Sequence, residues 1–130
     1  SNEEKLQIEK CGREIVKREL SDKGYHIEDM PQRNPGFDIK ATKQNEEIYV
    51  EVKAHSGKSN VVSLTSREYK EYVLCNRSNS NTKWQLWNVQ NLTKDSSDSV
   101  TIFCCEEIPE EALTEKEFRV DLSCCPEIKW

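Results

Sequence analysis

The alternating segment Ile48–Ala54 constrains the fold of this 130-residue chain more than any other part of it. Apolar and polar side chains follow one another in its sequence, IYVEVKA. Because successive strand residues face opposite sides of a sheet, this pattern predicts a β-strand with one apolar and one polar face. Glu51 and Lys53 would then lie together on the polar face. A short turn at 45–47 leads back to a second predicted strand, Phe37–Ala41, so we expect the two strands to pair as a hairpin.

The segments around this hairpin indicate an α/β fold. Residues Glu4–Asp22 place apolar side chains at helical spacing and end before Gly24, which predicts a first helix. Thr65 and Glu68 fit a capping box at the start of a second helix that reaches about Cys75. Further strands are predicted at Tyr25–Met30, Trp84–Gln90 and Val100–Cys105, and a short acidic helix at Pro109–Phe118. A helix, a three-strand meander, a crossover helix and later strands form an α/β plan with a mixed sheet.

The size and polarity of the chain exclude several classes of protein. A length of 130 residues suits one hydrophobic core and is too short for a (β/α)₈ barrel. No stretch approaches the roughly 18 consecutive apolar residues of a membrane span, and no signal peptide opens the chain. We therefore expect an intracellular protein, cytoplasmic or nuclear, without a membrane partner. Because the chain begins at Ser1 without Met, it resembles a fragment of a larger protein, whose other domains would be partners.

Charge divides the chain near residue 94. Residues 1–94 carry 16 Lys and Arg against 14 Asp and Glu, whereas residues 95–130 carry 3 against 10. We interpret residues 1–130 as one domain with a core at about 4–92 and an acidic C-terminal extension at 95–130. A strongly basic nucleic-acid footprint is absent, but the mildly cationic body is compatible with nucleic acid if metal ions assist.

The six cysteines favour reduced thiols over a disulfide framework. Four of them form two vicinal pairs, Cys104–Cys105 and Cys124–Cys125, and adjacent cysteines seldom reach good disulfide geometry. No C-x-x-C motif occurs, which disfavours a zinc ribbon. Two alternatives remain at this stage, a zinc cluster formed by the vicinal pairs and a secreted, disulfide-rich domain.

Asp38, Glu51 and Lys53 are the residues whose chemistry suggests a catalytic site. Two carboxylates a few ångströms apart make a hard-oxygen site suited to Mg²⁺. A lysine beside them could orient a water molecule or stabilise developing negative charge. The register of the hairpin decides whether Asp38 meets Glu51. The ordinary alternative is a solvated strand face with an ion pair worth under about 1 kcal/mol.

An ordered set of short motifs adds a family resemblance. The segment Gly36-Phe-Asp-Ile39, a turn and Ile48-Tyr-Val-Glu-Val-Lys53 together resemble the core motif of the PD-(D/E)XK nuclease superfamily. The chain is also similar, over roughly residues 10–92, to the C-terminal domain family of the plant protein NO VEIN. That similarity adds Gly12 and Val16 in the first helix, Gly24 after it, the Leu64-Thr-x-x-Glu68 helix start and the Leu86-Trp-Asn-Val89 strand.

The resemblance implies a restriction-endonuclease-like core, a mixed four- to five-stranded sheet flanked by helices. It implies that Asp38 and Glu51 bind Mg²⁺ or Mn²⁺ and that Lys53 is the catalytic lysine in the hydrolysis of DNA or RNA phosphodiesters. Many superfamily members also carry a Glu on the first helix, and the matching position here holds Arg13. The alternative is therefore a catalytically inert nuclease-fold module that binds protein or nucleic acid within a multidomain protein. Carboxylates converging with Lys53 would favour the enzyme, and a groove filled by residues 95–130 would favour the inert module.

Overall fold

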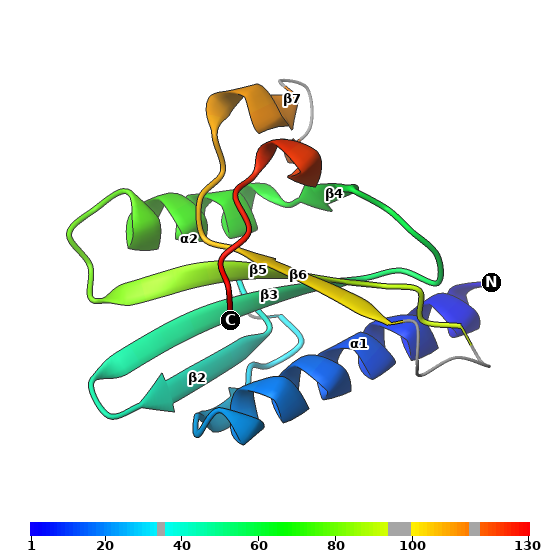
Figure 1. Cartoon of the computed structure of the whole chain (residues 1–130), viewed down its shortest axis with the longest axis horizontal. Coiled ribbons are helices and arrows are strands. Elements are labelled where there is room, and N and C mark those ends of the chain that lie inside the picture. Colours follow the sequence, from blue (N-terminus) through cyan, green and yellow to red (C-terminus); the bar gives the residue numbers. More distant parts are fainter. Residues whose placement is uncertain (34–35, 94–99, 115–117) are drawn as a thin grey trace.

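A five-stranded mixed sheet forms the central layer of the molecule (Figure 1). The computed structural model describes residues 1–33, 36–93, 100–114 and 118–130. The order of the strands across the sheet is β1-β2-β3-β5-β6. These strands are β1 (His26–Asp29), β2 (Ile39–Lys43), β3 (Glu46–Ala54), β5 (Thr82–Gln90) and β6 (Thr101–Cys105), and the helices are α1 (Asn2–Asp22) and α2 (Ser66–Asn76). The predicted α/β class and mixed sheet are confirmed.

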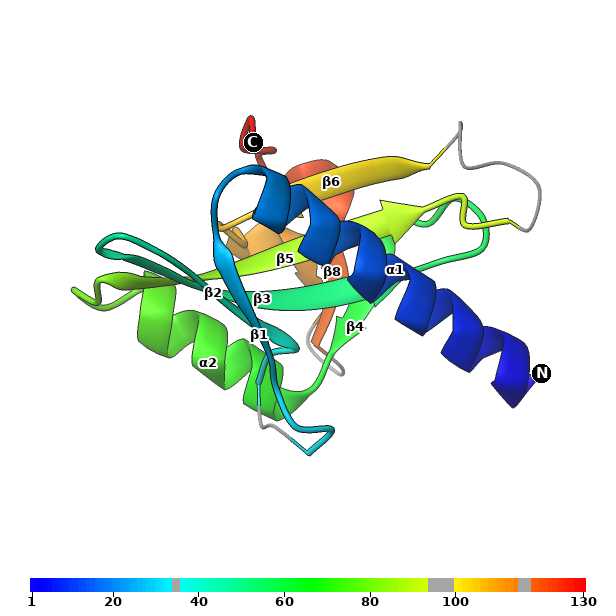
Figure 2. The same cartoon turned by 90° about the horizontal axis from the view of Figure 1, so that it is seen from below.

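The two helices cover opposite faces of the sheet (Figure 2). Trp87 of β5 packs in a buried cluster with Val16 and Leu20 of α1. Its neighbour Leu86 packs in the other cluster with Tyr72 of α2. Because adjacent strand residues point to opposite faces, β5 contributes to both cores and joins them.

The β2–β3 hairpin forms as predicted, with a small shift at its turn. Ile39 lies opposite Val50 in an antiparallel ladder. The turn is at Gln44 and Asn45, slightly earlier than the predicted 45–47, so β3 begins at Glu46. Gln44 adopts a φ of 55°, the left-handed conformation that a tight hairpin turn requires.

Strand β5 lies parallel to β3, and the connection between them contains α2. In this register, Leu86 lies beside Glu51 and Asn88 lies beside Lys53. The polar end of β3 therefore pairs with β5 on one side, whereas its pairing with β2 ends at Val50.

The predicted acidic helix at Pro109–Phe118 is wrong. Glu110–Ala112 forms a single 3₁₀ turn, and residues 115–117 lie outside the described residues. Around them, β7 (Leu113–Thr114) and β8 (Phe118–Asp121) form a second, three-stranded antiparallel sheet with β4 (Val61–Leu64). A last 3₁₀ turn, η3 (Leu122–Cys124), follows β8. The reason is tertiary: Leu113, inside the predicted helix, lies opposite Val120, and the buried Val120 lies opposite the buried Val62, so strand pairing overrides the local helical preference.

The C-terminal extension supplies β6, the far edge strand of the main sheet. Strand β6 pairs antiparallel with β5, with Cys104 opposite Trp87. Strand β5 is therefore an interior strand, paired with β3 on one side and β6 on the other.

All six cysteines are free thiols, and Cys75, Cys104, Cys105 and Cys125 are buried. Cys104 belongs to the core beneath α1, and Cys105 belongs to the core beneath α2. In the described part of the chain, no three His, Cys, Asp or Glu side chains form a group that could hold a metal ion. Cys104, Cys105 and Cys125 therefore pack as small apolar side chains, Cys124 is exposed, and the vicinal pairs form neither a zinc cluster nor disulfides.

Neither α1 nor α2 contains an 18-residue apolar stretch of the kind that crosses a bilayer, and the described residues hold no other candidate span.

Candidate active site

Asp38 reaches β3 at the point where β2 separates from it. The main-chain N–H of Asp38, just before β2, donates to the carbonyl of Val50 at 2.8 Å. Its carboxylate oxygen Oδ2 then accepts a hydrogen bond from the main-chain N–H of Val52 at 2.9 Å. The Asp38 carboxylate thus accepts the next hydrogen bond from β3 beyond the last backbone pair between β2 and β3. The hairpin register brings this carboxylate to the segment of β3 that carries Glu51.

Glu51 and Lys53 lie on the same face of β3 and contact each other. The ammonium nitrogen Nζ of Lys53 is 3.3 Å from Oε2 of Glu51. The exposed fractions of the two side chains are 20% for Lys53 and 6% for Glu51. The ordinary alternative of a solvated surface ion pair is therefore wrong, because this pair is largely removed from water.

Glu68 joins these residues, although the sequence assigned it only to helix capping. Its Oε1 accepts from Nζ of Lys53 at 3.1 Å and from the main-chain N–H of Thr65 at 2.9 Å. The hydroxyl of Thr65 accepts in return from the main-chain N–H of Glu68, which completes the predicted capping box. One carboxylate therefore starts α2 and also holds the amine of Lys53. Its position at the N-terminal turn of the crossover helix, which follows β3, is the sequence signal that could have identified it.

Burial and mutual repulsion control the protonation of the carboxylates. Burial raises the pKa of Asp38, while the Val52 N–H and the positive charge of Arg13 oppose that rise. Burial, followed by the nearby charge of Asp38, raises the pKa of Glu51 well above its ordinary value. Burial alone would lower the pKa of Lys53, but the negative charges of Glu51 and Glu68 outweigh it and raise that pKa. Lys53 is therefore a firmly protonated ammonium beside carboxylates that need further positive charge.

The donor set of Asp38 and Glu51 suits a divalent cation. Both are hard oxygen donors, and because burial raises the pKa of each, a bound cation would favour their ionised forms. Mg²⁺ usually binds one or two protein carboxylates and completes its shell with water and substrate phosphate oxygens. Among the described residues no third carboxylate completes a metal cluster, and from α1 it is the positive charge of Arg13 that acts on Asp38.

Buried amides on β5 hold the loop that follows β3. Oδ1 of Asn88 accepts from Nε2–H of His55 at 2.7 Å, and the amide nitrogen of Asn88 donates to the carbonyl of Ser59 at 2.9 Å. Gln90 accepts from the main-chain N–H of Ser59 at 2.7 Å. Loop 55–60 is therefore fixed at the end of the strand that carries Lys53, and His55 is engaged with Asn88.

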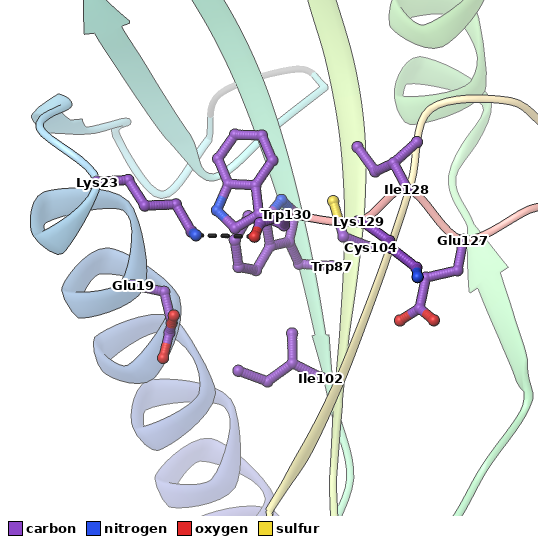
Figure 3. A pocket seen from close by; sticks show the side chains of 9 residues that line it. All are labelled: Glu19, Lys23, Trp87, Ile102, Cys104, Glu127, Ile128, Lys129 and Trp130. Carbon is purple, nitrogen blue, oxygen red and sulfur yellow. Dashed lines mark hydrogen bonds between the residues drawn. The ribbon is translucent and has the colours of Figure 1, made fainter.

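A separate hollow of about 350 Å³ lies between α1, β6 and the C-terminal residues (Figure 3). Its lining residues are Glu19, Lys23, Trp87, Ile102, Cys104, Glu127, Ile128, Lys129 and Trp130. Lys23 donates through Nζ to the main-chain oxygen of Trp130 at 2.9 Å, and the Trp130 ring packs edge-on against Trp87. Asp38, Glu51 and Lys53 do not line this hollow, so it is distinct from the carboxylate site.

Comparison with known protein families shows to which family the chain belongs. The sequence matches the model of the family described as "Protein NO VEIN, C-terminal" over residues 8–103, which is most of the chain. The chain belongs to the NO VEIN C-terminal domain family. No curated protein matches this NO VEIN domain.

The fold is also similar to that of a solved nuclease. Hjc of Archaeoglobus fulgidus, a Holliday junction resolvase from an archaeal hyperthermophile, superimposes with a TM-score of 0.54 at 22% sequence identity. The alignment covers 88% of this NO VEIN domain and 94% of the Hjc chain. The likeness shows a shared nuclease-like fold, so the predicted restriction-endonuclease-like core is confirmed, as is the family resemblance.

Proposed function

We propose that this NO VEIN domain is a metal-dependent nuclease that hydrolyses phosphodiesters of DNA or RNA. The observation that carries the proposal is the convergence of Asp38, Glu51 and Lys53 where β2 leaves β3. Removing two carboxylates and an ammonium from water costs free energy. Groups with pKa values shifted in this way concentrate at functional sites. The nuclease-like fold supports the same assignment.

Asp38 and Glu51 would hold Mg²⁺ or Mn²⁺, with Asp38 kept in place by its hydrogen bond to Val52. When bound, such an ion neutralises phosphate charge and lowers the pKa of a water molecule. Lys53 presents a protonated ammonium beside the carboxylates, where it can stabilise negative charge on the reacting phosphate or orient the attacking water. Glu51 and Glu68 hold that ammonium from two sides, which limits its rotamers.

The substrate would be a nucleic acid. The proposed setting is a larger intracellular protein, cytoplasmic or nuclear, whose other domains would bring the nucleic acid to this domain. Because Hjc is a Holliday junction resolvase, a four-way DNA junction belongs among the substrates to be tested.

A second function, an inert nuclease-fold binding module, is favoured by one observation. Among the described residues the carboxylate pair gains no third metal ligand, and the charge that α1 brings to Asp38 is the positive charge of Arg13. A weakened metal site would leave recognition without hydrolysis.

Calorimetric titration of Mn²⁺ and of Mg²⁺ into the domain tests the proposal, followed by cleavage assays on single-stranded, double-stranded and four-way-junction DNA and on RNA. Asp38→Asn should abolish saturable metal binding and lower cleavage by roughly 100-fold or more. Asp29→Asn is a matched control, because Asp29 is an exposed aspartate of β1 that pairs with Lys17. Absence of both metal binding and cleavage in the unmodified domain, with nucleic acid present, would establish the inert module.

A further inference from the structure

Arg13 lies on α1 at a close contact between that helix and β3. The preceding residue is Gly12, and a Cβ there would lie only 2.6 Å from Cβ of Ala54 and 3.7 Å from Cγ1 of Val52. The helix therefore packs against Val52 and Ala54, whose side chains point to the face of β3 opposite Glu51 and Lys53. One turn after Arg13, Lys17 pairs with Asp29 of β1, and Asp29 lies opposite Ile39, the neighbour of Asp38. Arg13 is half-buried there, and its charge is near enough to Asp38 to influence that carboxylate.

The guanidinium of Arg13 has no close partner in the part of the chain that the structure describes. Within the described residues, it takes part in no ion pair of 4.0 Å or less and in no hydrogen bond. The adjacent carboxylate of Glu14 is already occupied, because it pairs with Lys17 at 2.9 Å. A half-buried guanidinium with five unused N–H donors is suited to an incoming anion.

The candidate site needs such a cation when a substrate approaches. Asp38, Glu51 and Glu68 supply three carboxylates, and Lys53 supplies one ammonium that two of them already contact. This excess of negative charge repels a phosphodiester. Arg13 adds positive charge that acts on Asp38 from α1, on the face of the sheet opposite Lys53.

We propose that Arg13 binds a backbone phosphate of the nucleic acid and thereby positions the strand on the α1 side of the Asp38–Glu51 pair. The substrate class in this inference rests on the proposed function. Arginine suits the role because its planar fork can bind two phosphate oxygens at once, which a lysine cannot do.

The test measures nucleic-acid affinity by fluorescence anisotropy in EDTA, so that cleavage does not contribute to the readout. Short labelled DNA, single-stranded and duplex, and the matching RNA are titrated with protein at salt concentrations from about 50 to about 200 mM. The variants are Arg13→Gln, Arg13→Lys and Arg18→Gln. Arg18 is the matched control, because it is an exposed arginine on the same helix.

Arg13→Gln should weaken binding about 10-fold and reduce the slope of log affinity against log salt by about 1. Arg13→Lys should keep the slope and lose part of the affinity, and Arg18→Gln should change affinity by less than about twofold. Thermal unfolding verifies that each variant is folded. If Arg13→Gln does not fold, Arg13→Lys decides the matter, since unchanged affinity would then overturn the inference.

Equal effects of Arg13→Gln and Arg18→Gln would overturn the inference, as would an absence of nucleic-acid binding by the unmodified domain. Binding that depends on Arg13 without metal-dependent cleavage would instead refute the proposed hydrolysis and support this inference. Metal-dependent cleavage combined with binding that does not depend on Arg13 would support the proposed hydrolysis and refute this inference.

Discussion

Lys53 and Glu68 tie the strand that carries the candidate site to the first turn of the crossover helix. Nζ of Lys53 lies 3.1 Å from Oε1 of Glu68, and the same oxygen accepts from the Thr65 main chain. The capping of α2 and the orientation of the proposed catalytic amine therefore depend on one carboxylate.

This relationship predicts that cleavage and stability respond differently to two changes in the capping box. Glu68→Ala should lower cleavage and cost about 1 kcal/mol of unfolding free energy, because it removes both the cap and the partner of Lys53. Thr65→Ala should cost a similar free energy and leave most of the cleavage intact, since Thr65 does not contact Lys53. Urea unfolding and cleavage rates, measured well below the melting temperature, check this. Equal losses of cleavage in the two variants would contradict a positioning role for Glu68.

A second prediction concerns the dependence of stability on pH. Burial and Asp38 raise the pKa of Glu51 above 4.5, so the folded domain holds this proton more tightly than the unfolded chain does. The contribution of Glu51 to stability is fully present below about pH 4.5 and is lost as the pH rises through the raised folded-state pKa. Glu51→Gln should therefore stabilise the metal-free domain at pH 7 by on the order of 1 kcal/mol and have little effect near pH 4.

Denaturant unfolding in EDTA at the two pH values measures this difference. A stabilisation of the same size at both pH values would show that it does not come from the ionisation of Glu51.

A third prediction separates the structural and chemical roles of Asp38. Asp38→Asn keeps an acceptor for the Val52 N–H, whereas Asp38→Ala leaves that donor unpaired at a cost of about 1–3 kcal/mol. Both variants should lose divalent metal binding, because neither retains the charged carboxylate. Unfolding measurements together with calorimetric metal titration check the two effects. Metal binding retained by Asp38→Asn would exclude Asp38 as a ligand.

A fourth prediction concerns the approach of α1 to β3. Replacing a helical glycine with alanine normally stabilises by about 1 kcal/mol, but at Gly12 the new Cβ would lie 2.6 Å from Cβ of Ala54. Gly12→Ala should therefore destabilise the domain by about 1–3 kcal/mol, since the helix must shift away from the strand. Gly57→Ala is the control, because a Cβ there would meet no heavy atom within 4 Å. Equal unfolding free energies for the two variants would mean that α1 can shift away from Ala54 without a loss of stability.

Local sequence patterns determined much of this fold. The alternation in β3 and the capping of α2 by Thr65 involve neighbours or residues three apart, so their physical causes lie within the segment itself. The residue types at Asp38, Glu51 and Lys53 identified the candidate site, because paired carboxylates with a lysine suit one kind of chemistry.

The tertiary structure decided what those patterns could not. Val120 pairs with Val62 across a long stretch of chain, and that contact, rather than the helical preference of Pro109–Phe118, makes the C-terminal segment a strand. Glu68 meets Lys53, and Arg13 approaches Asp38, only because α2 and α1 pack against the sheet at particular positions. Such meetings depend on packing between distant elements and on their burial, and no pattern along the chain encodes a distance between them.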